Sequence, residues 1–199
     1  MTEVSVRQTQ LTINHQVDRA FTSSETGWQL VSGGITVATP SSLLLQCCAP
    51  VPLRNVALGK PSRSSSEFSS DFLPQRANDG VFTQPSNIFH SLANDTLPFL
   101  VIDLGLEYVI EAVALMPRLV TYGTRFEDIE IRTGLTYVLG PDFSTYTLLA
   151  LFPGPSPNPV TWVTTNLTVP VLGRYITVRR MAAPGEPLEV SELMVYSRT

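Results

Sequence analysis

Three basic side chains in the second half of the chain, His90, Arg118 and Arg125, could form a set of hydrogen-bond donors. The two arginines are seven positions apart and follow an apolar stretch that ends at Met116. A guanidinium group presents planar, fixed donors, and an imidazole adds one donor or one acceptor. Such a set could bind the oxygen atoms of a polar ligand. The alternative is that two exposed loop arginines and one half-buried histidine share no role.

Catalysis and nucleic-acid binding find no support in the sequence. The two histidines, His15 and His90, are far apart, and we find no Ser/His/Asp set, zinc-protease motif, phosphate-binding loop or dinucleotide fingerprint. The formal net charge is -4, whereas a nucleic-acid partner calls for a clustered excess of Lys and Arg. The most apolar stretch, residues 108–116, is interrupted by charge and too short to span a bilayer. We therefore expect a non-enzymatic protein with no nucleic-acid partner and no membrane span.

The elements that position these side chains are predicted to be strands. From Asn55 onward, short alternating or apolar runs are separated by turn signals, and no long amphipathic helix is apparent. Many short strands joined by turns predict an all-β, antiparallel jelly-roll β-sandwich for residues 51–199. The expected strands cover residues 100–104, 109–116, 129–133, 145–152, 160–163, 175–179 and 190–196.

Residues 1–50 are predicted to form a separate β-rich extension. Residues 4–13 alternate imperfectly, and two further strand-like runs follow at 35–38 and 42–46. Residues 49–52 indicate a stiff linker, because each proline fixes φ and disfavours helix before it. Short strands with unpaired edges seek partners, so we expect this segment to serve assembly or anchoring, through a protein partner or a second copy of the chain.

The cysteines and the N-terminus bear on the compartment. Cys47 and Cys48 are neighbours and cannot join distant parts of the chain. We expect reduced thiols, with a strained vicinal disulfide as the alternative. The first residues lack the basic and apolar regions of a signal peptide, so synthesis in a cytoplasm is expected.

Five segments after Asn55 resemble, in order, the discoidin domain (the type C domain of coagulation factors), and specifically its F-type lectin branch. The resemblance covers about 145 residues and implies the galactose-binding-domain-like jelly roll of that family, with a sugar-binding function. It is carried by NVALGKPSRSSS at 55–66, RANDG at 76–80, FHS at 89–91 with PFLVIDLG at 98–105, GRYITV at 173–178 and SELMVY at 191–196.

The resemblance implies a fucose-binding site built from one histidine and two arginines, which match His90, Arg118 and Arg125. Two guanidinium groups would bind the ring oxygen and hydroxyls, and an apolar side chain would pack on the C–H face of the sugar. The family loop between the arginines usually carries an Asp and adjacent cysteines, whereas residues 119–124 read LVTYGT. The carboxylate that would orient an arginine is missing from this loop, which leaves the specificity for fucose open. Candidates for the apolar contact are Tyr122, Phe89 and Phe126.

The same resemblance implies a structural calcium ion. Asp79 and Glu192 match the side-chain ligands of the family, and Asn87 falls where the family has a serine ligand. Calcium prefers about six to eight oxygen ligands, backbone carbonyls included, in an irregular cage. The alternative is that Asp79 begins a plain turn and that Glu192 is a solvated strand residue. Backbone carbonyls would come from Arg76, Val81 and Ser191.

These observations predict a lectin-like carbohydrate-binding module that serves adhesion or surface decoration. Its expected partner is a glycan with a fucose-like or other cell-surface sugar. The absence of a signal peptide and of stapling disulfides favours a virus or phage particle over a serum lectin, so we expect an extracellular or virion-surface location. The alternative is a structural protein of a capsid or tail that uses the same sandwich without glycan binding. A module of a carbohydrate-active enzyme is a third hypothesis, but this chain offers it no catalytic partner.

Overall fold

The computed structural model describes residues 51–119, 125–156, 161–181 and 186–198. The chain divides into two units, Met1–Cys48 and Ala49–Thr199, and the following description concerns the second. The predictions for residues 1–50, including the state of Cys47 and Cys48, lie outside the described residues.

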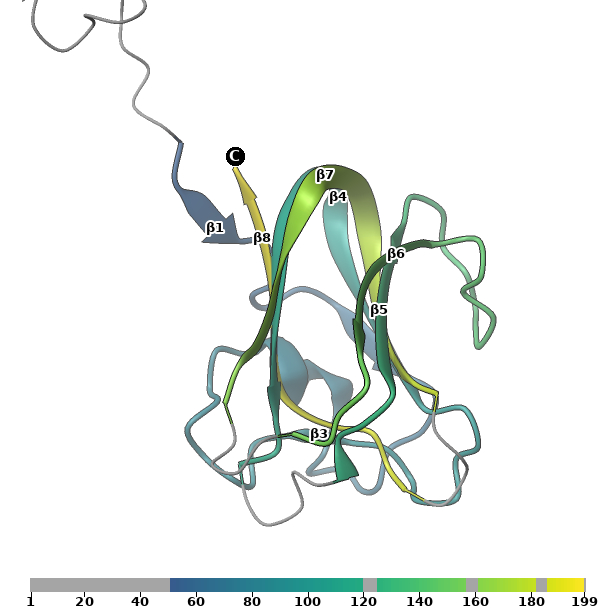
Figure 1. The fold of residues 1–199 in the computed structure, drawn as a ribbon. Coiled ribbons are helices and arrows are strands. Elements are labelled where there is room, and N and C mark those ends of the chain that lie inside the picture. The colour runs from purple at the N-terminus through teal and green to yellow at the C-terminus, as the bar shows by residue number, and fades with distance from the viewer. Residues whose placement is uncertain (1–50, 120–124, 157–160, 182–185, 199) are drawn as a thin grey trace, which may run out of the picture. The chain divides into compact units, whose positions relative to one another are not determined.

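Antiparallel strands and one short 3-10 helix make up the described part of the second unit (Figure 1). The strands pair in the order β1-β8-β4-β7-β5-β6, with β2 beside β4 and β3 beside β8. The predicted all-β antiparallel sandwich is therefore confirmed. Among the described residues, no helix has the length and apolar character needed to cross a bilayer. The elements are β1 (Leu53–Asn55), β2 (Ser62–Ser64), η1 (Pro74–Asn78), β3 (Phe89–His90), β4 (Phe99–Pro117), β5 (Ile129–Gly134), β6 (Thr147–Phe152), β7 (Val163–Arg180) and β8 (Glu189–Arg198).

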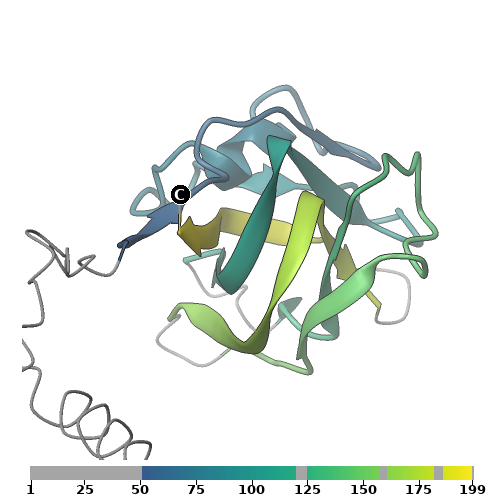
Figure 2. The same cartoon turned by 90° about the horizontal axis from the view of Figure 1, so that it is seen from above.

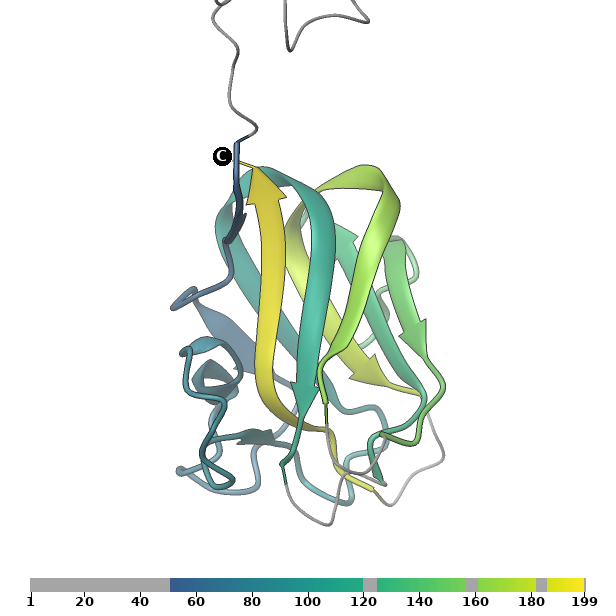
Figure 3. The same ribbon diagram turned by 60° about the vertical axis from the view of Figure 1, so that its left-hand side comes forward.

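The two longest strands, β4 and β7, belong to both layers of the sandwich. The first half of β4 and the second half of β7 lie with β2, β5 and β6, and we call this layer the β5 sheet. Their other halves lie with β1, β3 and β8, and we call this layer the β8 sheet. Figures 1 and 3 show β4 and β7 curving over from one layer to the other.

Two glycines and a register shift mark the bend. The β4–β7 pairing shifts between Asp103 and Tyr108, and Gly105 within this span has a φ of +83°, a conformation that glycine adopts at little cost. On β7, a Cβ at Gly173 would lie 1.9 Å from the hydroxyl oxygen of Thr133. The expectation of separate strands at 100–104 and 109–116 is therefore wrong, because Gly105 lets β4 bend without ending.

The core lies between the two sheets and makes the sandwich a rigid support for its loops. Alternate residues of each strand face inward, as the two-residue period of a strand requires. Full burial of such an aliphatic side chain contributes about 1.5–3 kcal/mol. The fully buried positions include Leu100, Ile102, Ile176 and Val178 from the β5 sheet and Leu115, Leu193 and Val195 from the β8 sheet.

The two ends of the second unit meet at one edge of the β8 sheet. Leu53 of β1 is the partner of Arg198 of β8, and Figure 2 shows the C-terminus beside β1. Strand β3 pairs with the opposite end of β8, where Phe89 is the partner of Val190 and His90 is the partner of Glu189. The loop end of the sandwich, away from the C-terminus, therefore receives His90.

Candidate functional site

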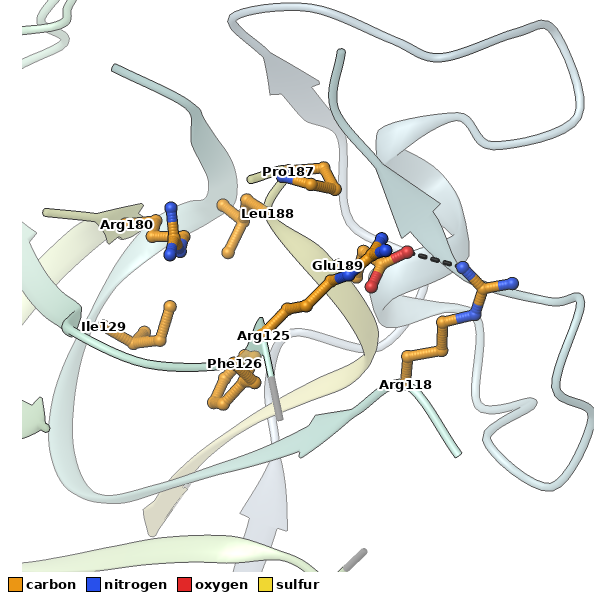
Figure 4. A pocket seen from close by; sticks show the side chains of 8 residues that line it. All are labelled: Arg118, Arg125, Phe126, Ile129, Arg180, Pro187, Leu188 and Glu189. Carbon is orange, nitrogen blue, oxygen red and sulfur yellow. Dashed lines mark hydrogen bonds and ion pairs between the residues drawn. The ribbon is translucent and has the colours of Figure 1, made fainter. Parts of the chain in front are cut away.

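A buried carboxylate at the start of β8, Glu189, holds two of the three predicted donors. His90 is its cross-strand partner, and β4 ends at Pro117 opposite Val190, which brings Arg118 to the same place. His90 Nε2 lies 2.9 Å from Glu189 Oε1, and Arg118 Nη1 lies 2.5 Å from the same oxygen. Figure 4 shows the contact between Arg118 and Glu189. The carboxylate that the loop 119–124 lacks is therefore supplied by another strand.

The charge of Glu189 is stabilised by its partners. Burial alone would raise the pKa of this carboxyl group, but hydrogen bonds and positive charge from His90 and Arg118 outweigh burial and hold the pKa below its ordinary value. His90 Nδ1 also lies 2.6 Å from the carbonyl oxygen of Ser91. Both ring nitrogens thus lie beside oxygen atoms that can accept a hydrogen bond. Glu189 fixes the direction of both the ring and the guanidinium group.

Arg118 and Arg125 line one narrow pocket beside Glu189, whose free volume is about 0 Å³ (Figure 4). Both arginines come from the segment between β4 and β5, Arg118 directly after β4 and Arg125 four positions before β5 begins. A third arginine, Arg180 at the end of β7, also lines it. The apolar part of the lining consists of Phe126, Ile129, Pro187 and Leu188.

Each of these arginines has a carboxylate partner. Arg125 Nε lies 3.1 Å from Glu186 Oε2, and Arg180 Nη2 lies 3.0 Å from Glu127 Oε1. With the Arg118–Glu189 pair, each of the three arginines that line the pocket in the described part of the chain is paired with a carboxylate. The arrangement suits an uncharged, hydroxyl-rich ligand better than an ion, because an ion would leave one charge uncompensated.

The aromatic residues that the sequence analysis proposed as ligand contacts are not exposed at the pocket in the described part of the structure. Phe89 is fully buried in the core, because neighbouring strand residues point to opposite faces and His90 takes the face toward Glu189. The prediction that Phe89 contacts a ligand is therefore wrong. Phe126 lines the pocket but is only 4% exposed. Tyr122 lies outside the described residues.

Two aromatic side chains that sequence reasoning missed surround His90. The ring centroids of Phe68 and Phe72 lie 4.8 Å and 5.6 Å from that of His90. Backbone hydrogen bonds tie this loop to β3, since Phe68 N donates to His90 O and His90 N donates to Phe72 O. Phe68 is 56% exposed. A phenylalanine in an otherwise serine-rich segment was the available signal, and its exposed ring is free to contact a ligand.

The predicted cation ligands also gather in one place. Asn87 Nδ2 donates to both carboxylate oxygens of Asp79, over 3.1 Å and 3.0 Å, and to the carbonyl oxygen of Val81 over 2.9 Å. An amide nitrogen thus occupies the centre of three oxygens that could face a cation. Arg76 Nη1 donates to Asn87 Oδ1 over 2.9 Å.

Glu192 of β8 completes this group. Gly80 N donates to Glu192 Oε2 over 3.0 Å, while Oε1 is buried without a hydrogen-bond partner among the described residues. Burial is the main cause that raises the pKa of this carboxyl group to about 7, and the charge of Asp79 raises it further. Its neighbour Ser191 is buried, and the Ser191 hydroxyl donates to Pro117 O over 3.0 Å.

The donor set fits a hard cation that takes oxygen ligands. Within the described ranges, no three His, Cys, Asp or Glu side chains gather closely enough to hold a metal by themselves. Two carboxylates, an amide and a backbone carbonyl are the mixture that calcium uses. If the Asn87 amide turned over, Oδ1 would replace Nδ2 beside Asp79 and Val81. An unpartnered buried oxygen on Glu192 is the observation that calls for a further positive or donating group.

No protein-family model matches the chain, and a search of curated proteins found no significant match. Solved structures do match. The fucolectin from Morone saxatilis (striped bass) serum has a TM-score of 0.65 at 21% identity, and the match covers 73% of this chain and 49% of that chain. A Streptococcus pneumoniae fucose binding module has a TM-score of 0.58 at 19% identity, covering 73% and 99%.

A third match is the family 32 carbohydrate-binding module from C. perfringens in complex with galactose. Its TM-score is 0.59 at 18% identity, and the match covers 73% of this chain and 100% of that chain. The fold is that of the F-type lectins. The resemblance recognised in the sequence is thereby confirmed for the fold of the second unit. The chain spans about half the length of the striped bass F-type lectin and the whole length of the two bacterial modules.

Proposed function

We propose that this chain is a non-catalytic carbohydrate-binding protein whose sugar site is the pocket beside Glu189. The observation that carries the proposal is the shared carboxylate, which holds His90 and Arg118 beside the pocket that Arg125 lines. Because these donors are already fixed, their side chains lose little further conformational entropy when a sugar binds. The exposed ring of Phe68 offers a face for the C–H groups of the sugar.

A neutral sugar is the best candidate. The paired charges around the pocket favour hydroxyl groups over a carboxylate or a sulfate, and the structural relatives include modules named for fucose and one solved with galactose. Fucose and galactose share an axial hydroxyl group that could meet several donors at once. We therefore propose a fucose- or galactose-terminated glycan as the partner.

The full chain should bind at least one fucosylated or galactosylated glycan on a printed array. Binding should persist on glycans that carry no charge and fall when sialic acid or sulfate caps the terminal sugar. The array is read with and without calcium. A chain that is folded by circular dichroism and binds none of the neutral glycans would contradict the proposal.

A calcium ion is proposed as a structural support of this module. Asp79, Asn87, Glu192 and the Val81 carbonyl would hold it, and Arg76 and Ser191 are the further candidates for backbone ligands. Bound calcium would supply the positive charge that Glu192 lacks and would join the loop after η1 to β8. None of the proposed calcium ligands lines the pocket, so we assign the ion to stability.

Adhesion or surface decoration is the proposed setting, with residues 1–50 as the assembly segment. The described residues of the second unit already contain both sheets and the core. A chain that begins at Val51 should therefore fold as a monomer and keep its glycan binding, while any oligomer of the full chain is lost. Light scattering after gel filtration measures the oligomeric state, and a thermal unfolding scan shows whether the truncated chain is folded. Loss of folding in the truncated chain would show instead that residues 1–50 belong to one core.

A further inference from the structure

The outer face of the β8 sheet carries a groove that the proposed sugar site does not use. Two alanines of β4 form its floor, since Ala112 lies between Tyr196 and Asn166 and Ala114 lies between Met194 and Thr164 on the neighbouring strands. Small residues in the middle strand and larger ones on both sides leave a depression of about 530 Å³. That volume is within the range of ligand-binding clefts. Figure 3 shows β8, β4 and β7 side by side on this face.

The other outer face of the sandwich, on the β5 sheet, is covered by side chains from the chain itself. On the β5 sheet, the side chains of Phe99, Val101 and Tyr175 are covered by Phe143 and Tyr146 from the segment between β5 and β6. Within residues 51–119, 125–156, 161–181 and 186–198, no corresponding segment fills the groove of the β8 sheet. The contrast shows that this fold can cover an apolar sheet face with its own chain, whereas the described residues leave this face open.

Aromatic rings line the groove. Trp162, just before β7, packs edge-to-face against Phe82, with ring centroids 5.1 Å apart, and Tyr196 extends the aromatic lining on β8. Both Trp162 and Phe82 are partly exposed. Flat apolar rings of this kind match the C–H faces of sugar rings, which bury little polar surface when they stack.

The polar side chains that line the groove are uncharged and could form hydrogen bonds with a ligand. Among the described residues, none that lines the groove is charged. The structure gives no hydrogen bond to the side chains of Trp162, Thr164 or Asn166 within the described part of the chain. Tyr196 Oη donates to the thioether of Met194 over 3.0 Å, and sulfur is a weak acceptor that a sugar hydroxyl could replace. Aromatic rings, an amide and hydroxyls without any charge are the complement of a neutral glycan.

We propose that this groove is a second glycan-binding site, which takes the neutral sugar rings of an oligosaccharide on Trp162. Phe82 supports the Trp162 ring, and Thr164 and Asn166 bind the hydroxyls along one side. The site is distinct from the pocket at Arg118 and shares no residue with it. Met194 lies five residues beyond Glu189 on β8, which is about 17 Å along an extended strand. The proposal therefore stands whether or not the Arg118 pocket binds sugar.

Tryptophan fluorescence of the full chain tests the proposal directly. The chain has two tryptophans, Trp28 and Trp162, so Trp28→Phe leaves Trp162 as a reporter at the groove. The probes are cellohexaose, mannohexaose, a xyloglucan heptasaccharide and lacto-N-tetraose. We expect a saturable change of Trp162 emission with at least one of them, and an unchanged response when Arg118→Ala is added. Phe82→Ala should lower the affinity measured by this titration at least tenfold. The control is Tyr137→Ala, which removes an exposed aromatic ring away from the groove and should leave the affinity unchanged.

Two results would overturn the proposal. One is a Trp162 emission that no probe changes at millimolar concentration. The other is a ligand-free spectrum of a buried indole that acrylamide does not quench, which would mean that protein already covers the groove. Dependence of that spectrum on protein concentration would assign the cover to a second copy, and independence would assign it to the same chain.

Discussion

Replacing Arg118 by alanine should strongly weaken glycan binding at the Glu189 pocket while the sandwich stays folded. The substitution removes the charge-assisted donors that Glu189 holds beside the pocket. Loss of such hydrogen bonds costs about 1.5–3 kcal/mol, which is roughly a 10–150-fold loss of affinity. Titration calorimetry with the best glycan from the array measures the loss. Arg118→Lys should restore little, because an ammonium group lacks the planar pair of donors.

The control is a second guanidinium–carboxylate pair at the other end of the sandwich. Arg174 donates to Asp103 over 2.8 Å and 3.0 Å beside the bend of β4. Arg174→Ala removes a comparable ion pair without touching the pocket, so glycan affinity should not change. Thermal unfolding of both variants separates folding from binding. If Arg118→Ala binds as tightly as the parent chain, the pocket at Glu189 is not the sugar site.

In calcium-free buffer, the ionisation of Glu192 should make the chain less stable near neutral pH than in mild acid. The folded state raises the pKa of this carboxyl group from 4.5 to about 7, so between these values the native state binds a proton that the unfolded state has released. Stability from this group is complete below about pH 4.5 and is lost as the pH rises through about 7. The shift corresponds to about 3 kcal/mol. Urea unfolding with a chelator at about pH 5 and pH 7.5 measures it.

Glu192→Gln provides the matched control, because its amide is neutral at both pH values. The free energy of unfolding of the parent chain should fall relative to this variant as the pH rises. Calcium should reverse the loss in the parent chain at about pH 7.5 and should act much less on the variant, since a bound cation favours the ionised carboxylate. Equal melting temperatures of the parent chain with calcium and with chelator at that pH would refute the calcium site.

Glu189 and Glu192 show how strand position decides the chemistry of like residues. Both are buried carboxylates of β8, three residues apart. Glu189 meets an imidazole and a guanidinium group, and its pKa lies below the ordinary value. Glu192 meets a backbone N–H and another carboxylate, and its pKa lies above. Because of these different partners, Glu189 positions two hydrogen-bond donors, whereas ionised Glu192 would be stabilised by a bound cation.

The amino-acid sequence by itself determined the fold class, and it pointed to the three basic side chains of one candidate site and to the oxygen-bearing residues of the other. Alternating apolar residues determine which face of a strand can be buried, so the strands at 129–134 and 189–198 were predicted to within a few residues. The ordered motifs pointed to the F-type lectin fold, and through it to His90, Arg118 and Arg125. These features are local or carried by spacing along the chain, which is why they could be found without coordinates.

Only the tertiary structure decided which side chains meet. Phe89 and His90 are neighbours, and either could have faced the core; the pairing of β3 with β8 sends Phe89 inward. The same pairing makes Glu189, almost one hundred residues away, the partner of His90. The groove on Ala112 likewise depends on the register of three strands. Register joins residues that are distant in sequence, and it is fixed when the apolar faces of the paired strands are buried together in one core.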